Sequence, residues 1–158
     1  MEDSKGEKNK MNNDKVISTL NNLIETCKDG EQGFRTAAEG LRDLQTKTIF
    51  QEYARQRAQM AIELQAEVLR LGGDPEKAGS VSGSMHRGWI NIKSAVTGKD
   101  DSSIIAEAER GEDVAKSAYE SAIKEALPPQ TQTIVRRQAG QVREAHDRVR
   151  AMERATAR

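Results

Sequence analysis

The sequence predicts an all-α domain folded as a four-helix bundle, and three features support this prediction. First, only 3% of the residues are aromatic while 32% are charged, a composition typical of helix-rich chains. Second, apolar residues recur every three or four positions along four segments of similar length, which is the pattern of amphipathic helices. Third, the stretch 27–39 (CKDGEQGFRTAAE) returns in altered form at 108–120 (AERGEDVAKSAYE). The second half of the domain is therefore expected to repeat the first.

The folded domain is expected over residues 13–158. Residues 1–12 are almost wholly polar, and a segment with so little to bury is predicted to be a disordered tail. Capping residues, glycines and prolines mark the bounds of the helices. The four long helices are expected to begin near Asn13, near Thr46, within residues 100–103 and just after Pro129.

Residues 72–100 form a connection that is longer than a hairpin between neighbouring helices needs. It contains a short helical pattern and can cross the whole bundle, so the second and third long helices are expected to run parallel. The four long helices are expected to follow the order up-up-down-down. In this connection, His86, Arg87 and Trp89 are predicted to anchor the chain onto the bundle. The alternative is that they bind an anion at the start of the short helix.

The totals exclude several classes of function. Lys and Arg number 25, as do Asp and Glu, so the chain lacks the basic excess of a nucleic-acid-binding surface. The single cysteine, Cys27, cannot form an internal disulfide, which favours a cytoplasmic location. No apolar run is long enough to cross a membrane. Motifs for nucleophilic catalysis, phosphate binding or zinc binding are also missing.

Three stretches carry a resemblance to a known family. LIETCKDGEQGF, LGGDPEKAGSVSGSMHRGWINIKSAVTG and ERGEDVAKSAYESAIKEAL together resemble a family of bacterial four-helix-bundle proteins catalogued as a domain of unknown function. That family belongs to the ferritin-like superfamily and is distantly related to rubrerythrin. The resemblance covers about residues 14–155. It implies the ferritin-like fold and a general or stress-linked role, without an established activity.

The resemblance also implies where a di-iron centre would lie. Di-iron members of the superfamily use one Glu on each of two helices and a Glu-x-x-His pair on each of the other two. Glu31 and Glu112 match the single glutamates, and His146 matches one histidine. However, Arg57 and Arg143 stand where the glutamates of the two pairs are expected. The resemblance therefore indicates a degenerate site.

Two hypotheses follow for this site. In the one we favour, Arg57 and Arg143 pair with Glu31 and Glu112 inside the bundle, with His146 hydrogen-bonded nearby. The protein then needs no cofactor, is not an enzyme, and acts as a structural or interaction protein that can self-associate. In the alternative, iron or manganese is bound by Glu31, Glu112, His146 and Glu63, and supports iron oxidation or peroxide chemistry.

Overall fold

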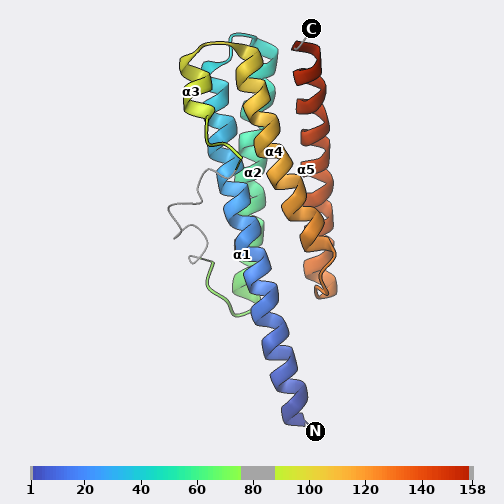
Figure 1. Cartoon of the computed structure of the whole chain (residues 1–158). Coiled ribbons are helices and arrows are strands. Elements are labelled where there is room, and N and C mark those ends of the chain that lie inside the picture. The colour runs from blue at the N-terminus through green and yellow to red at the C-terminus, as the bar shows by residue number, and fades with distance from the viewer. Residues whose placement is uncertain (1, 76–87, 157–158) are drawn as a thin grey trace.

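The structure is a computed structural model that describes residues 2–75 and 88–156. The described residues form four long helices and one short helix. The long helices lie side by side, and the short one sits at one end of the bundle (Figure 1). No strand occurs in the described ranges. The helices are α1 (Glu2–Gly40), α2 (Leu44–Arg70), α3 (Ile92–Thr97), α4 (Asp101–Ile123) and α5 (Pro129–Thr156).

The helices run up, down, down and up, with the long crossover between α2 and α4 (Figure 1). Residues 41–43 join α1 to α2 and residues 124–128 join α4 to α5, and connections this short force antiparallel neighbours. The predicted parallel course of the second and third long helices is therefore present. The predicted up-up-down-down order is wrong, because the two short connections reverse the chain within each pair.

Side-chain caps set the starts of α2 and α4. The Asp43 carboxylate accepts a hydrogen bond from the Thr46 backbone N–H at 2.9 Å, so α2 begins slightly earlier than the sequence predicted, with Thr46 inside its first turn. Asp100 caps α4 through the Ser102 N–H. Pro129 opens α5, where its fixed φ and missing N–H fit the first helical position.

Helix α1 begins at Glu2, where the sequence predicted a disordered tail. Its first turns extend beyond the ends of the other helices (Figure 1). Since adding a residue to an existing helix costs far less than nucleating one, the polar residues can continue the helix that the apolar face of α1 holds on the bundle.

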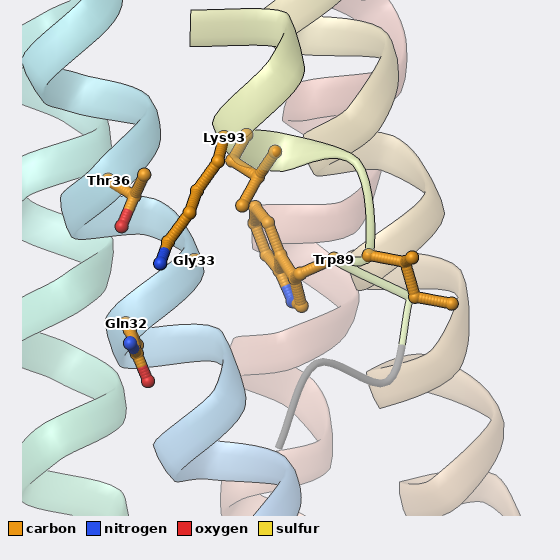
Figure 2. Close-up of a pocket in the computed structure, with 7 residues that line it drawn as sticks. Gln32, Gly33, Thr36, Trp89 and Lys93 are labelled. Carbon is orange, nitrogen blue, oxygen red and sulfur yellow. The ribbon is translucent and has the colours of Figure 1, made fainter. Parts of the chain in front are cut away.

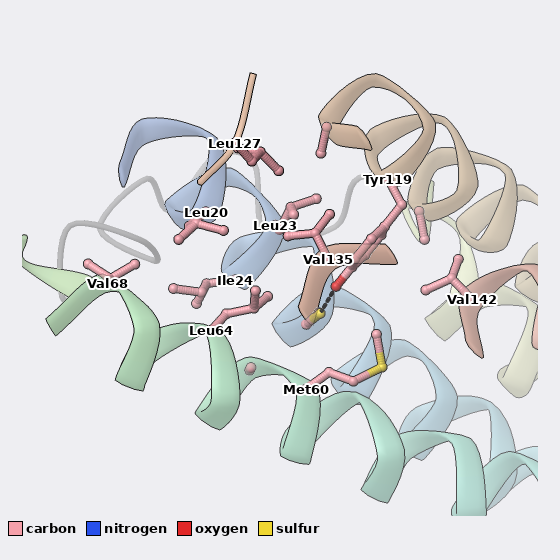
Figure 3. Packing of buried hydrophobic residues seen from close by; sticks show 14 of the residues in the cluster. Leu20, Leu23, Ile24, Met60, Leu64, Val68, Tyr119, Leu127, Val135 and Val142 are labelled. Carbon is pink, nitrogen blue, oxygen red and sulfur yellow. Dashed lines mark hydrogen bonds between the residues drawn. The ribbon is translucent and has the colours of Figure 1, made fainter. Parts of the chain in front are cut away.

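The core consists of two apolar clusters stacked along the bundle. The first, here called the Cys27 cluster, is shown in Figure 3 and includes Leu20, Leu23, Ile24, Cys27, Met60, Leu64, Val68, Tyr119, Val135 and Val142. The second, here called the Phe34 cluster, includes Phe34, Phe50, Trp89, Ile104, Ile105 and Val149. None of the described helices is long and apolar enough to cross a membrane.

Candidate functional site

A buried ion pair lies at the boundary between the two core clusters. Arg57 Nη2 on α2 donates to Glu112 Oε2 on α4 at 2.6 Å, and the two side chains are 1% and 0% exposed. On α2 and on α4, the core residue that precedes the ion-pair residue along the helix belongs to the Phe34 cluster. The core residue that follows it belongs to the Cys27 cluster. These flanking residues are Ala54 and Met60 on α2, and Ala108 and Ala115 on α4.

Helix α1 makes room for the guanidinium group. A Cβ on Gly30 would lie 2.9 Å from Arg57 Nη1, so a larger residue there would push against the arginine. On another side, Arg57 Cζ lies 5.5 Å from the ring centroid of Phe34, close enough for a cation–π contribution. The backbone at Gly30 and the Phe34 ring therefore position the side chain that pairs with Glu112.

The ion pair keeps Arg57 charged despite its burial. Burial acts to lower the pKa of Arg57, but the charge of Glu112 and its hydrogen bond outweigh this effect and raise the pKa overall. A charge without a partner in such a position would be very costly. Glu112 therefore supplies the compensation that allows Arg57 to occupy the core.

The other predicted Glu–Arg pair does not form in the core. Glu31 has a side chain 25% exposed and pairs with Arg35 one turn along α1. Arg143 is exposed on α5. The expectation that Glu31 and Arg143 would join the buried cluster is wrong, because both lie at the edge of their helices' apolar faces. Gly30, and not Glu31, faces Arg57.

His146 and Glu63 have other partners. His146 is buried on α5, with Nε2 at 2.7 Å from Asp113 Oδ1 and Nδ1 at 3.1 Å from Asp147 Oδ1. The histidine therefore links α5 to α4 through carboxylates at the rim of the bundle. Glu63 on α2 forms an ion pair with Arg137 on α5.

Sequence reasoning missed a hydrogen-bonded chain that crosses all four long helices. Cys27 Sγ lies 3.1 Å from the Tyr119 hydroxyl (dashed in Figure 3), which donates to Gln138 Oε1 at 2.7 Å. Gln138 Nε2 then donates to Glu63 Oε1 at 2.7 Å. Gln138 could have been found, because it stands between Val135 and Val142 at helical spacing.

This network leaves Cys27 and Tyr119 as neutral groups. Burial raises the pKa of the Cys27 thiol to about 11, although the hydrogen bond with Tyr119 and the charge of Arg57 act against it. Burial also raises the pKa of Tyr119 well above its usual value, and the neighbouring Cys27 adds to this effect. Neither group is poised as a nucleophile or a base near neutral pH.

The crossover is fixed to the bundle through Trp89, which is 2% exposed. Its ring fills a slot between α1 and α4. A Cβ added to Gly33 of α1 would lie 2.2 Å from the indole ring, and a Cβ added to Gly111 of α4 would lie 2.1 Å from it. Beside the ring is a small hollow of about 80 Å³ that Lys93 overhangs (Figure 2). His86 and Arg87, predicted as further anchors, lie outside the described residues.

The residues present do not fit a di-iron centre. Glu112 is committed to Arg57 and His146 to Asp113, while Glu31 points to Arg35. Within the described ranges, no group of three or more His, Cys, Asp or Glu side chains is arranged to hold a metal ion. A dication beside Arg57 would also meet a fixed positive charge at close range.

The helix order and the long crossover are those of a ferritin-like four-helix bundle. A family model described as a domain of unknown function (DUF2383) matches residues 15–125, and the chain belongs to this family.

A solved structure shows the same fold. It is a two-domain protein from Anabaena variabilis containing DJ-1/ThiJ/PfpI-like and ferritin-like domains, with a TM-score of 0.76 and 17% sequence identity. The match covers 91% of this chain and 40% of the other, so this chain corresponds to less than half of that protein. No curated protein matches this chain.

Proposed function

We propose that this protein is a non-catalytic ferritin-like bundle that acts as a structural or interaction protein, with the Arg57–Glu112 pair in place of a metal centre. The observation that carries the proposal is the 2.6 Å contact between two fully buried, oppositely charged side chains. In a di-iron bundle, two cations balance the inward-facing carboxylates. Here a single guanidinium balances a single carboxylate, and it is permanently protonated.

The surrounding groups support the same proposal. Redox or peroxide chemistry needs a metal or a reactive side chain. The one thiol is neutral because its pKa is raised to about 11, and the tyrosine beside it is shifted in the same direction. The polar interior of this bundle is therefore better suited to holding four helices in register than to turning over a substrate. The proposed location of the protein is the bacterial cytoplasm, and its proposed role is linked to stress.

Elemental analysis of the protein tests this proposal. The full chain is purified from cells without added metal, and iron, manganese and zinc are measured per chain after dialysis. A second sample is incubated anaerobically with ferrous iron, desalted and measured in the same way. We expect well under one metal ion per chain in both samples. About two irons per chain, retained through desalting, would overturn the proposal in favour of a metalloprotein.

A further inference from the structure

Three polar atoms of the central ion pair have no hydrogen-bond partner among the protein atoms of the described ranges. They are Nε and Nη1 of Arg57 and Oε1 of Glu112. Both side chains are essentially inaccessible, so bulk solvent does not reach these atoms. Buried polar groups in proteins are nearly always hydrogen-bonded. Three open positions on one ion pair therefore point to a small ligand held inside the bundle.

The charges at the site decide what kind of ligand fits. Arg57 and Glu112 together carry no net charge, and the adjacent Cys27 and Tyr119 are neutral because burial raises the pKa of both groups. Arg57 repels a cation and Glu112 repels an anion. The open atoms are N–H donors and a carboxylate acceptor, which require a neutral molecule that both accepts and donates hydrogen bonds.

Water is the small molecule with this chemistry. We propose that the Arg57–Glu112 pair is an internal hydration site, in which a water molecule accepts a hydrogen bond from Arg57 and donates one to Glu112 Oε1. Buried waters typically make about three hydrogen bonds to otherwise unpaired groups. A water beside the pair can bond to Glu112 Oε1 and to one of the two open arginine nitrogens, because Nε and Nη1 face different sides of the guanidinium. The ion pair at the centre of the bundle is thus bridged by solvent in addition to its direct contact.

The competing arrangement is a bidentate ion pair. In it, the guanidinium turns so that Arg57 Nε also donates directly to Glu112 Oε1. The packing around the arginine opposes this rotation. Nη1 lies against the backbone of α1 at Gly30, and the Phe34 ring lies 5.5 Å from Cζ. Gly30 and Phe34 are both buried. They therefore hold the guanidinium in the orientation that makes a single hydrogen bond to Glu112.

A crystal structure of the full chain at about 1.5 Å resolution or better tests the proposal. We expect an ordered solvent peak at hydrogen-bond distance, about 2.7–3.2 Å, from Glu112 Oε1 and from Nε or Nη1 of Arg57. A direct bond between Arg57 Nε and Glu112 Oε1 overturns the proposal. So does the absence of a solvent peak while the side chains keep their present positions.

A solution measurement tests the same point independently. In protein labelled with ¹⁵N, the Arg57 Nε–H resonance is assigned as the signal lost in an Arg57→Met/Glu112→Leu double variant. We expect it to show a cross-relaxation peak to a long-lived water. Arg70 serves as the reference for contact with bulk water. Its Nε donates directly to Glu67 Oε1 at 2.6 Å, and its side chain is 45% exposed. An Arg57 signal without a water peak contradicts the proposal.

Discussion

At the scale of single residues, the polar side chains buried in this bundle are held by ion pairs and hydrogen bonds to other helices or to the next turn. Glu67 on α2, like Glu112, is a buried carboxylate that is balanced by an arginine. It is 3% exposed, and its carboxylate accepts from Arg70 at 2.6 Å and from the Thr131 hydroxyl at 2.6 Å. The hydroxyl contact ties the end of α2 to the start of α5. Charge-assisted hydrogen bonds of this kind are stronger than neutral ones.

Glu67 is expected to make the protein sensitive to acid. The hydrogen bond from Arg70 lowers its pKa, burial acts in the opposite direction, and Thr131 adds to the lowering. A lowered carboxyl pKa contributes stability that is complete above the unfolded value, about 4.3 for Glu, and is lost as pH falls through the folded value. Urea unfolding of wild type and Glu67→Gln should therefore differ most near pH 7, and the difference should shrink towards pH 3. A difference that does not change with pH contradicts this account.

Cys27 is expected to be inert in the folded protein. Its thiol is fully buried, and burial raises its pKa to about 11, so almost no reactive thiolate forms at pH 8. Reaction with a thiol reagent such as Ellman's reagent should be slow in buffer and fast in denaturant, where the thiol is free. Rapid reaction of one thiol per chain under native conditions would show that the site opens or that the thiol is activated.

The sequence identified both residues of the central pair, but it also predicted Glu31 and Arg143 inside the bundle, where the structure does not place them. Arg57 and Glu112 were identified because both occupy ligand positions that the resemblance to di-iron bundles implies. Glu31 was identified in the same way, but apolar periodicity alone does not distinguish the centre of a helix's apolar face from its edge. The guanidinium occupies the space beside Gly30, which is a fact of tertiary packing.

At the scale of elements, the described end of the crossover is held on the bundle by Trp89 and Ile92, both buried in the Phe34 cluster. Gly88 has a φ of +79°, and a Cβ there would lie 2.7 Å from the Gly111 Cα, so the chain approaches α4 more closely than other residues allow. Trp89 then enters between α1 and α4, beside Phe34 at a ring-centroid distance of 4.9 Å. The glycines of the repeat thus serve to receive the crossover.

A matched pair of glycine substitutions tests this role. Gly111→Ala places a methyl group 2.1 Å from the Trp89 ring, so the ring must move, and overpacking of this kind costs about 1–3 kcal/mol. The single tryptophan should also report its displacement by a red-shifted fluorescence emission.

Gly140→Ala is the control for this test. Gly140 also lies inside a helix, with nothing within 4 Å of its Cβ position, and alanine there should stabilise the protein by about 0.5–1 kcal/mol. Both variants are measured by urea unfolding. Equal effects of the two substitutions would mean that the slot is not tightly filled.

The helices themselves could be predicted because their signals are local. Apolar spacing, capping residues and prolines gave four long helices and a short one in the crossover, and their bounds shifted by only a few residues where Asp43 replaced Thr46 as a cap. The first turns of α1 were not predicted, since their polar composition carries no burial signal. The up-up-down-down order is wrong because the connections at residues 41–43 and 124–128 are too short to join parallel helices.

At the scale of the whole molecule, the repeat places equivalent stretches of α1 and α4 at one level. Trp89 touches both Gly33 and Gly111, so the two copies of the repeat meet there. The symmetry is broken at the centre, where α4 contributes Glu112 and α1 contributes the space beside Gly30. One carboxylate and one guanidinium thus occupy the position at which a symmetric bundle would bring carboxylates together.

The central claim is that this ion pair, and not a metal, balances the charge at the centre of the bundle. A double-mutant cycle tests it most directly, with urea unfolding of wild type, Arg57→Met, Glu112→Leu and the double variant, each with and without added iron or manganese. Each single change should cost about 3–5 kcal/mol because it leaves a buried charge unpaired, the double variant should recover much of that loss, and metal should change none of the four. If the single changes are harmless and iron or manganese stabilises the wild type, the claim is contradicted.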